Sequence, residues 1–568
     1  MSFATKADVD AVGNEMPWVE RSVSETMYEF INSVAERHGK RPGISFQLTS
    51  GPKDKAETLS WQEFRDKSVQ AANLFRQLGI GEKDVVAYLL PICNEAALTL
   101  IGGSIAGIAN PINPLLEPEQ IAAILRETNA KVLVTLTGFP KTDLAQLAAD
   151  AVAEAPNVET VLEVDLNRYL SPPKSWIVPL IRPKVNVNHS ARVMNFNIEL
   201  DKHNLSLNFD DAADDRVAAY FHTGGTTGMP KVAQHKYSGM VYNGWLGDRL
   251  LFKPEDTIIC PLPLFHVFAC HVILMAMISS GAHVVFPTPQ GYRGDGVFDN
   301  FWKLIERWNV SFMITVPTAI SALMQRPIDA DVSSLRTAFS GSAPLPVELF
   351  KKFEKATGVE IVEGYGLTEA TCLVSCNPDQ GLKKVGSVGL PLPHTNVKIL
   401  MDTADGPKEC NRDEIGEICI ENPGVYAGNT YTELAKNDNL YHFETYLRTG
   451  DLGRIDEDGY LWITGRAKDL IIRGGHNIDP AEIEEALAGH EAVGFAGAIG
   501  QPDAHAGEIP CAYVELVGGG SATPEELIEF VNARVSEKAA QAKYIEILPE
   551  LPKTAVGKVF KPALRKSA

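Results

Sequence analysis

The chain has 568 residues, which is too many for one hydrophobic core, so we expect two or more domains. Its 45% apolar and 22% charged residues are ordinary for a soluble globular protein. A net charge of -20 argues against a nucleic-acid-binding protein, which should carry a basic face. A protein this acidic must gather its basic side chains locally wherever it handles phosphates.

The cysteines and the N-terminus indicate a cytoplasmic location. The eight cysteines include no CxxC pair and lie mostly in apolar runs, as expected of buried thiols in a reducing compartment. The first residues lack the basic start and apolar run of a signal peptide. The most apolar stretch, Val272 to Phe286, is interrupted and too short to span a bilayer. We therefore expect no transmembrane segment, which leaves room for peripheral membrane contact.

Strands and helices alternate in the first part of the chain. Residues 1–20 show no clear period and are expected to form an arm. Ser60 and Glu63 form a capping box, and Gly79 suits the end of the helix that follows. Strands are expected at 85–90 and 131–135, with helices at about 95–106 and from 118. This alternation predicts an α/β fold with a parallel sheet covered on both faces.

Residues 165–205 interrupt the alternation. The segment 171–183 has too many prolines for a regular element, yet it carries Trp176, Ile177, Leu180 and Ile181. We favour a packed surface insertion. The alternative is a lid beside an apolar substrate mouth or a membrane surface.

The alternation resumes from Leu250 to Val362, and a smaller unit begins near Lys468. The expected strands of the larger part are 257–261, 283–286, 311–316 and 337–340. In the smaller unit, helices begin at Asp479-Pro480 and Thr523-Pro524, and the expected strands are 493–499, 511–517 and 544–548. We therefore predict a compact α+β domain of about 100 residues at the C-terminal end.

A loop rich in glycine and threonine, residues 223–231, follows an expected buried strand at 217–221. Glycines let backbone N–H groups approach an anion, threonines add donors, and a lysine adds positive charge. The loop is not a Walker motif, because Met229 and Pro230 stand where that spacing needs Gly-Lys. The alternative for this loop alone is a flexible surface turn.

Two further loops, 340–345 and 363–369, follow expected strands, the second of them at 359–362. Ligands bind beyond the carboxyl ends of parallel strands, so both loops should face the same crevice as the phosphate loop. Short polar motifs then follow at 448–451, 465–469, 473–476 and 552–558.

Taken together, these motifs resemble the adenylate-forming superfamily of acyl-CoA synthetases, peptide-synthetase adenylation domains and luciferases. The resemblance runs from about residue 25 to the end and rests on 223–231, 364–369, 449–451, 465–469 and 552–558. It implies an N-terminal AMP- and acyl-binding domain, 1–467, of parallel-sheet α/β subdomains, and a small mobile α+β domain, 468–568. It also implies ATP-dependent formation of an acyl-adenylate and pyrophosphate, followed by transfer of the acyl group to coenzyme A.

The resemblance also implies where ATP binds. The residues it places around the phosphates are Thr223, Gly224, Gly225, Thr226, Thr227, Gly228 and Lys231. Those it places around adenine and ribose are Ser342, Ala343, Pro344, Glu363, Gly364, Tyr365, Asp451 and Arg466.

By the same resemblance, Lys558 is catalytic and bridges the carboxylate and the α-phosphate, although most lysines near a C-terminus are solvated. Thr368 would donate to the α-phosphate, and Glu369 would hold Mg²⁺ through the hard oxygen that this ion prefers. His266 would lie beside the acyl carboxylate, with a satisfied core histidine as the alternative. Lys468 aligns with the family's hinge, and Gly474 and Gly475 with its coenzyme A tunnel.

The acyl pocket is expected at Val316, Phe339, Gly341 and Gly366. Acetate-specific relatives have tryptophan in place of Gly366, so glycine predicts a larger acid. Apolar walls favour a medium- or long-chain fatty acid, with an aromatic acid as the alternative. Transfer to a carrier protein is also left open, as is the oligomeric state. A non-catalytic nucleotide-binding protein should lack Lys558 or Glu369, and both are present.

Two departures from the family pattern stand out. Val232-Ala233 replaces the usual Gly or Ala followed by Val, and Lys561 replaces an arginine common among relatives. Neither should remove phosphate binding or displace Lys558.

Overall fold

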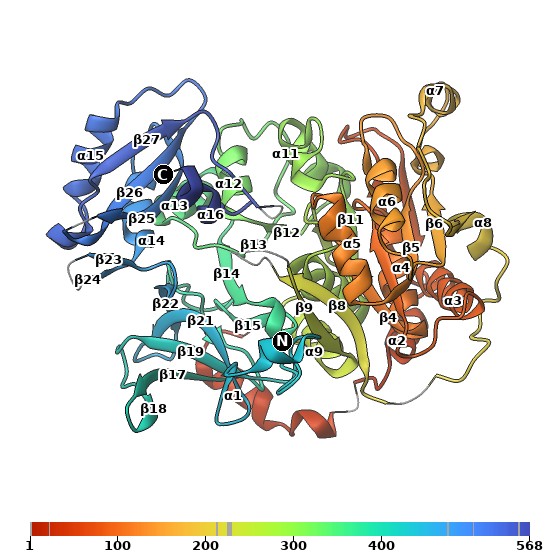
Figure 1. The fold of residues 1–568 in the computed structure, drawn as a ribbon, viewed down its shortest axis with the longest axis horizontal. Coiled ribbons are helices and arrows are strands. Elements are labelled where there is room, and N and C mark those ends of the chain that lie inside the picture. Colours follow the sequence, from red (N-terminus) through yellow and green to blue (C-terminus); the bar gives the residue numbers. More distant parts are fainter. Residues whose placement is uncertain are drawn as a thin grey trace.

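The computed structural model describes residues 3–21, 23–211, 214–223, 230–473, 476–503, 505–554 and 557–567. In these ranges the chain forms four sheets, three before Lys468 and one after it (Figure 1). The α/β class with a small C-terminal α+β unit is confirmed. No helix in the described ranges is both long and apolar enough to cross a membrane. The cytoplasmic location stays a prediction.

A seven-stranded sheet, in the order β7-β6-β5-β3-β4-β8-β9, ends at the predicted phosphate loop. Its strands are β3 (Val85–Leu89), β4 (Ile108–Pro111), β5 (Ala130–Leu136), β6 (Thr160–Val164), β7 (Arg192–Asn195), β8 (Val217–Thr223) and β9 (Lys231–Lys236). All neighbours are parallel except β8 and β9. The helices in this part of the chain are α3 (Trp61–Gln77), α4 (Asn94–Ala106), α5 (Pro118–Glu127), α6 (Leu144–Ala153), α7 (Lys174–Ile181) and α8 (Phe196–Leu200). The alternation predicted from the sequence is present.

A nine-stranded sheet supplies the opposite wall of the site, in the order β16-β15-β14-β13-β12-β10-β11-β1-β2. Its strands are β1 (Pro42–Gln47), β2 (Ala56–Ser60), β10 (Thr257–Ile259), β11 (His283–Phe286), β12 (Phe312–Thr315), β13 (Thr337–Ser340), β14 (Ile361–Gly366), β15 (Leu373–Cys376) and β16 (Leu390–Pro391). Its helices are α2 (Met27–His38), α9 (Tyr237–Leu250), the π-helix η3 (Phe268–Met275), α10 (Ala276–Ser280), α11 (Val297–Trp308), α12 (Pro317–Leu323) and α13 (Val347–Thr357). Within this sheet, the neighbouring strands β14, β13, β12, β10, β11 and β1 run parallel. Their carboxyl ends therefore meet at one edge of the sheet.

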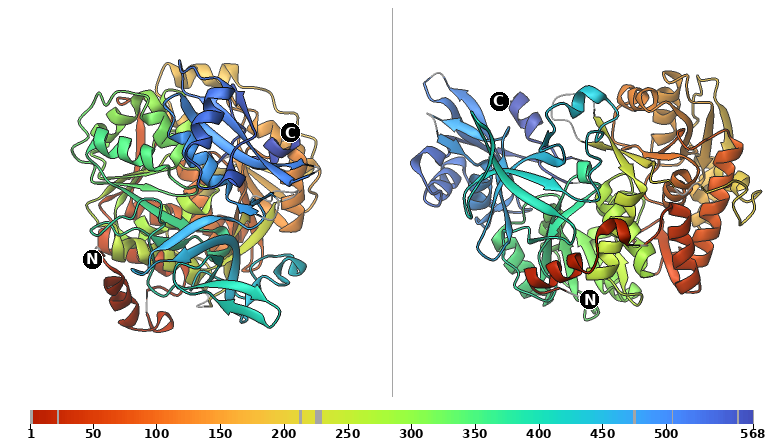
Figure 2. Two further views of the ribbon diagram at one scale, coloured as in Figure 1. Left: turned by 90° about the vertical axis from the view of Figure 1, so that its left-hand side faces the viewer. Right: turned by 90° about the horizontal axis from the view of Figure 1, so that it is seen from below.

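The remaining two sheets lie on either side of the predicted boundary at 467/468. The first consists of β17 (Asn396–Thr403), β18 (Gly406–Glu409), β19 (Gly416–Glu421), β20 (Tyr441–His442), β21 (Tyr446–Ile455) and β22 (Leu461–Arg466). The second consists of β23 (Ile471–Arg473), β24 (His476–Ile478), β25 (Val493–Asp503), β26 (Gly507–Leu516) and β27 (Tyr544–Leu548), with α14 (Pro480–Ala488), α15 (Pro524–Asn532) and α16 (Lys561–Ser567). This last sheet has a hydrophobic core of its own and stands apart at one end of the molecule (Figure 2).

The N-terminal arm differs from the prediction because it contains a helix, α1 (Lys6–Asn14). Thr5 and Asp8 form a capping box, and Val9 and Val12 are buried. The capping pattern was missed because aspartate stands where glutamate or glutamine usually completes it.

The insertion also differs from the prediction, because it forms the regular helix α7 (Lys174–Ile181) despite Pro179 within it. Proline cannot donate to the carbonyl four residues earlier, which belongs to Ser175. That carbonyl accepts a hydrogen bond from Asn167 Nδ2 at 3.1 Å instead. A side chain outside the helix therefore satisfies the group that proline leaves without its usual partner.

The expected loop at 363–369 is wrong in its first half, because β14 extends to Gly366. Residues 364–366 pair antiparallel with β15, which lengthens the strand beyond its parallel neighbour β13. Tyr365 is therefore held by a sheet rather than by a loop.

Candidate active site

The predicted phosphate-binding loop lies between β8 and β9, which pair antiparallel as a hairpin. Thr223 and Lys231 pair across it at the two ends of the loop. Gly224, Gly225, Thr226, Thr227 and Gly228 lie outside the described residues. Lys231 Nζ lies 4.6 Å from the centre of the Tyr431 ring, so its ammonium group sits over an aromatic face.

Tyr431 links this lysine to the predicted metal ligand, because its hydroxyl donates to Glu369 Oε1 at 2.6 Å. Burial and the neighbouring Glu369 carboxylate raise the pKa of Tyr431, so the hydroxyl remains a donor. Thr368 and Glu369 begin the short helix η5 (Thr368–Ala370). The sequence analysis missed Tyr431, which stands in a loop without a recognisable motif.

A three-residue network occupies the predicted ribose side. Asp451 is buried, and its carboxylate accepts hydrogen bonds from the Tyr365 hydroxyl at 2.6 Å and from Arg466 Nε at 2.7 Å. Burial and the Asp451 charge raise the pKa of Tyr365 well above its ordinary value. An acceptor-only carboxylate in this position is suited to the two hydroxyls of a ribose.

The predicted adenine loop follows β13 and contains a residue with a left-handed backbone, Ser342, whose φ is 72°. Such a conformation is uncommon for a non-glycine residue and is often found at functional sites. Glu363 supports this loop by accepting a hydrogen bond from the backbone N–H of Leu345 at 3.3 Å, and it also accepts one from Gly386. Burial raises the pKa of Glu363 to about 7. Ala343 and Pro344 continue the loop, and Gly364 follows Glu363 on β14.

Lys558 reaches the N-terminal part of the molecule through a tight loop. Its backbone N–H donates to Thr554 Oγ1 at 3.1 Å, and Arg293 donates to the Thr554 carbonyl at 2.9 Å. A Cβ atom built on Gly557 would lie 2.6 Å from Thr318 Oγ1, so glycine is required for this close approach. These contacts hold Gly557, the residue before Lys558, close to the start of α12.

The charges around Lys558 belong to the other predicted site residues. Burial and the positive charge of Arg466 lower the pKa of Lys558 to about 8, while Asp451 opposes the shift. Burial, with the charge of Lys558, lowers the pKa of His266 to about 4. The structure thus brings Lys558, His266, Asp451 and Arg466 into one electrostatic environment.

The predicted acyl pocket is apolar. Val316 and Phe339 are buried, and the Phe339 ring lies 5.7 Å from that of Phe268. A Cβ atom on Gly341 would lie 2.9 Å from Phe268 Cζ, so this ring covers the glycine. Phe268 was missed by the sequence analysis, although it follows His266 by two residues in the same run.

Gly366 has a structural requirement independent of any substrate. A Cβ atom there would lie 2.0 Å from the carbonyl oxygen of Cys372, where β14 and β15 come close. The opening of the acyl pocket by Gly366 stays a prediction.

The predicted hinge, Lys468, lies in the turn between β22 and β23, while Gly474 and Gly475 lie outside the described residues. Lys561, which departs from the family pattern, forms an ion pair with Glu484 at 2.7 Å. The substitution therefore retains a charge contact within the C-terminal unit.

Two buried histidines connect β9 to the Thr368 segment. His235 Nε2 lies 2.7 Å from the Thr368 carbonyl oxygen, and His235 Nδ1 lies 3.0 Å from His271 Nε2. A carbonyl only accepts, so His235 Nε2 carries the proton. Burial lowers the pKa of both histidines, so Nδ1 of neutral His235 accepts from His271. The pair thus helps to hold the backbone next to Glu369.

Comparison with known proteins agrees with this geometry. The AMP-binding enzyme family model matches residues 31–429, and the model of the AMP-binding enzyme C-terminal domain matches residues 482–558. A marinolic acid–CoA ligase from Pseudoalteromonas sp. (strain SANK 73390) is 36% identical, covering 97% of this chain and 82% of the relative. A long-chain-fatty-acid–CoA ligase from Bacillus subtilis (strain 168) is 30% identical, covering 97% of this chain and 96% of the relative.

The fold is also found in a crystal structure of an anthranilate CoA ligase in complex with anthranoyl-AMP. The TM-score is 0.81 at 24% identity, covering 97% of this chain and 99% of that chain. The chain therefore belongs to the AMP-binding enzyme family, as an AMP-forming acyl-CoA ligase.

Proposed function

We propose that this enzyme activates a medium- or long-chain fatty acid and transfers it to coenzyme A. The observation that carries the proposal is the shared environment of Lys558, His266, Asp451 and Arg466 beside an apolar wall. The marinolic acid and long-chain fatty acid ligases, as relatives over nearly the whole chain, support an acid larger than acetate.

In the first half-reaction, a carboxylate oxygen attacks the α-phosphorus of ATP, and the bond from that phosphorus to the pyrophosphate oxygen breaks. Both reactants are anions, so positioning and charge neutralisation supply most of the catalysis. We assign to the Lys558 ammonium the role of bridging the two reacting groups. The close approach of the neighbouring Gly557 to the start of α12 would place the ammonium between the nucleotide side and the acyl side.

On the nucleotide side, Asp451 would accept the ribose hydroxyls while Arg466 holds its carboxylate in place. Tyr365 would present its ring to adenine, opposite the Ser342, Ala343 and Pro344 loop. Thr223 and Lys231, at the two ends of the hairpin loop, would bind the terminal phosphates together with the glycines and threonines between them, and Thr368 would donate to the α-phosphate.

Glu369 is suited to Mg²⁺, because a carboxylate is a hard oxygen ligand and within the described chain only its Oε1 has a hydrogen-bond partner. When bound, the ion would neutralise phosphate charge. Tyr431 and the His235–His271 pair would orient this segment from two sides.

In the second half-reaction, the thiol of coenzyme A attacks the acyl carbonyl carbon, the thiol proton is released, and AMP leaves as the carbon–oxygen bond breaks. Rotation about Lys468 would withdraw Lys558 and turn the Gly474–Gly475 segment toward the thiol. His266 would act here as a neutral imidazole, since its pKa is about 4. The division at 467/468 is part of this proposal.

The proposal is tested by carboxylate-dependent ATP–pyrophosphate exchange with acids from acetate to octadecanoate, and with benzoate and cinnamate. We expect exchange with hexanoate and longer acids, little with acetate, and release of AMP on addition of coenzyme A. Exchange confined to the aromatic acids would show that the substrate is an aromatic acid and not a fatty acid. Exchange without turnover on coenzyme A would point to a carrier protein as acceptor.

A further inference from the structure

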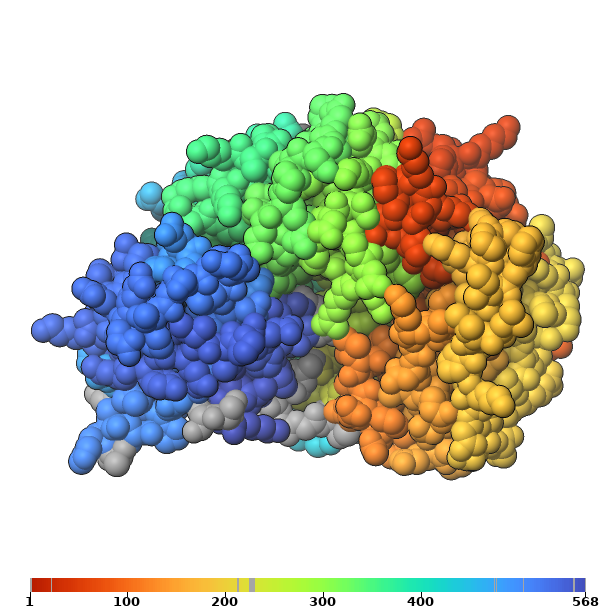
Figure 3. Space-filling view, turned by 90° about the horizontal axis from the view of Figure 1, so that it is seen from above, coloured from red at the N-terminus to blue at the C-terminus, as the bar shows by residue number. Residues whose placement is uncertain are grey.

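The helix α7 exposes a continuous apolar face. Trp176 is 70% exposed and Leu180 is 83% exposed, and Ile177 and Ile181 are also exposed. Neighbours among these four positions are one, three or four residues apart, so they share one side of the helix. The helix lies on the outer edge of the molecule, and the residues around it face the viewer in gold in the view from above (Figures 1 and 3).

Three contacts attach α7 to the protein. Val178 points inward and is buried, and Asn167 donates to the Ser175 carbonyl at the first turn. Beyond the last turn, Arg182 forms an ion pair with Asp165 at 2.6 Å. The contacts of Val178, Ser175 and Arg182 therefore attach α7 to the protein, and its apolar face stays exposed.

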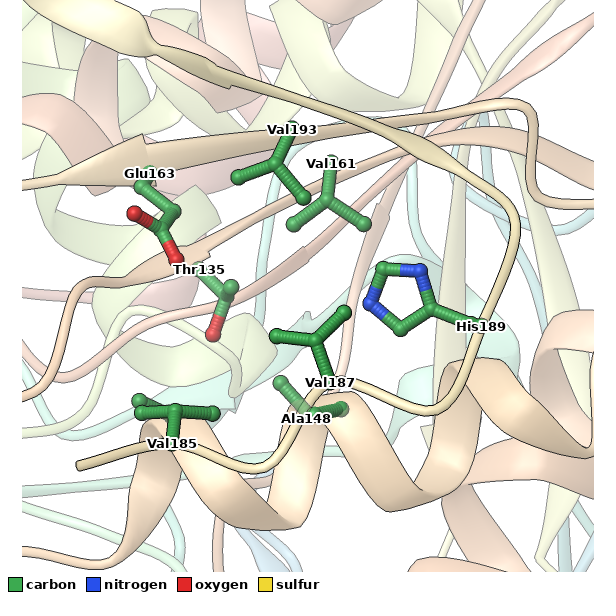
Figure 4. A pocket seen from close by; sticks show the side chains of 10 residues that line it. Thr135, Ala148, Val161, Glu163, Val185, Val187, His189 and Val193 are labelled. Atoms are coloured by element: carbon green, nitrogen blue, oxygen red, sulfur yellow. The ribbon is translucent and has the colours of Figure 1, made fainter.

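The loop after α7 is partly packed, because Val185 and His189 are half-buried whereas Val187 is 48% exposed. Val185, Val187 and His189 point toward Val161 and the other strand residues across a narrow hollow (Figure 4). The hollow measures about 10 Å³, too little for any ligand larger than a water molecule. This packing holds Lys184 close to the end of α7.

The charge of this segment is opposite to that of the whole protein. Residues 171–198 contain four basic side chains and no acidic one, whereas the chain carries a net charge of -20. Arg182 pairs with Asp165, but the side chains of Lys174 and Lys184 have no hydrogen-bond or ion-pair partner in the part of the chain that the structure describes. Lys174 lies in the first turn of α7 and Lys184 three residues beyond its end, so unpaired positive charges flank the apolar face.

We infer that the surface formed by α7 and residues 182–184 docks on an anionic lipid bilayer. Tryptophan and aliphatic side chains enter the boundary between headgroups and acyl chains, while flanking lysines and arginines attract anionic headgroups. A second copy of this chain fits less well, because a two-fold contact through this face would place basic groups against their own copies. One short helix predicts reversible, salt-sensitive binding rather than stable anchoring.

Binding to the bilayer does not depend on the proposed function. If that function also holds, docking would bring the enzyme to a membrane in which a fatty acid dissolves. Failure of the docking inference and failure of the substrate proposal are separable, because vesicle binding is measured without turnover.

The test is co-sedimentation of the full chain with phosphatidylcholine vesicles, with and without an equal part of phosphatidylglycerol. We expect binding to the mixed vesicles that weakens markedly between about 0.1 M and about 1 M salt. The variant W176A/L180E should lower partitioning by at least about tenfold, since both side chains are apolar and would be buried in lipid. The control Leu382→Glu changes a leucine that is also exposed, between β15 and β16.

A second variant, K174Q/K184Q, should lower partitioning about tenfold and reduce the salt dependence. Its control, K352Q/K355Q, removes two exposed lysines from α13. Unchanged melting temperatures and unchanged exchange activity without vesicles would show that the variants fold. The inference is overturned if the parent does not bind mixed vesicles, or if the α7 variants bind no more weakly than their controls. It is likewise overturned if the α7 variants only convert a dimer into a monomer in light scattering.

Discussion

The two sides of the proposed site are built from opposite kinds of residue. On the nucleotide side, Tyr365, Asp451 and Arg466 are joined by directional, charge-assisted hydrogen bonds. On the acyl side, Phe268 and Phe339 meet through ring packing, with no charged group between them.

This difference predicts two kinds of selectivity. Hydrogen bonds that involve charge fix distance and direction. The nucleotide side should therefore accept one ligand, and it should lose much of its affinity for that ligand when one of its polar side chains is changed. Apolar walls discriminate by about 1–3 kcal/mol for each methylene, so the acyl side should show graded preference.

The largest effect is expected from Lys558→Ala. Removing the ammonium leaves the two reacting anions without their bridging charge, so pyrophosphate exchange should fall by about 10²–10³-fold. Lys543→Ala, which removes an exposed lysine from the same C-terminal unit, is the control and should leave exchange unchanged. Exchange within threefold of the parent in Lys558→Ala would contradict the role given to this lysine.

The next largest effect is expected from Asp451→Asn. The substitution keeps the shape but removes the charge that would accept from the ribose and from Arg466. Hydrogen bonds to charged groups contribute about 1.5–3 kcal/mol, so the KM for ATP should rise about 10- to 100-fold. Asp405→Asn, in the exposed turn between β17 and β18, is the control. An unchanged KM for ATP would exclude Asp451 from nucleotide binding.

On the acyl side we expect a smaller, graded effect from Gly341→Val. Its Cβ would lie 2.9 Å from Phe268 Cζ, so the added methyl groups would push into the space around that ring. The ratio of kcat/KM for long acids to that for short acids should fall about tenfold. Gly518→Val adds the same side chain where no atom lies within 4 Å, and should not change the ratio. An equal loss with all acids would show that Gly341 does not lie along the acyl chain.

The smallest effect near neutral pH is expected from the titration of Lys558. Its pKa is lowered to about 8, so the ammonium loses its proton as pH rises through this value. kcat/KM for ATP, which reports the free enzyme, should fall to half near pH 8 and about tenfold one pH unit higher. Bound phosphates favour the charged form, so the fall in kcat should come at higher pH. A flat profile of kcat/KM up to pH 10 would contradict the titration.

Parts of the structure that follow local rules could be predicted from the sequence. The capping box at Ser60, the start of a helix at Thr523-Pro524 and the strand at 217–221 are confirmed. Helix α7 could not be predicted, because its proline is tolerated only through the side chain of Asn167 outside the helix. The extension of β14 to Gly366 likewise depends on a partner strand that forms later in the chain.

In the candidate site, too, the contacts that depend on distant parts of the chain could not be predicted. Lys558, Asp451 and Arg466 stand in short motifs and were found from the sequence, and the structure places their charges together. Tyr431 contacts Lys231 and Glu369 only because a distant loop folds over the hairpin. The role of the His235–His271 pair also depends on a distant contact, because His235 donates to the Thr368 carbonyl more than a hundred residues away. Contacts of this kind carry no local pattern.

The central claim is that Lys558 serves adenylation and is withdrawn before thioester formation. The most direct test separates the two half-reactions in Lys558→Ala. We expect the variant to lose carboxylate-dependent pyrophosphate exchange and yet to convert supplied acyl-adenylate and coenzyme A to the thioester at nearly the parent rate. Equal loss of both half-reactions, or retention of both, would contradict the account.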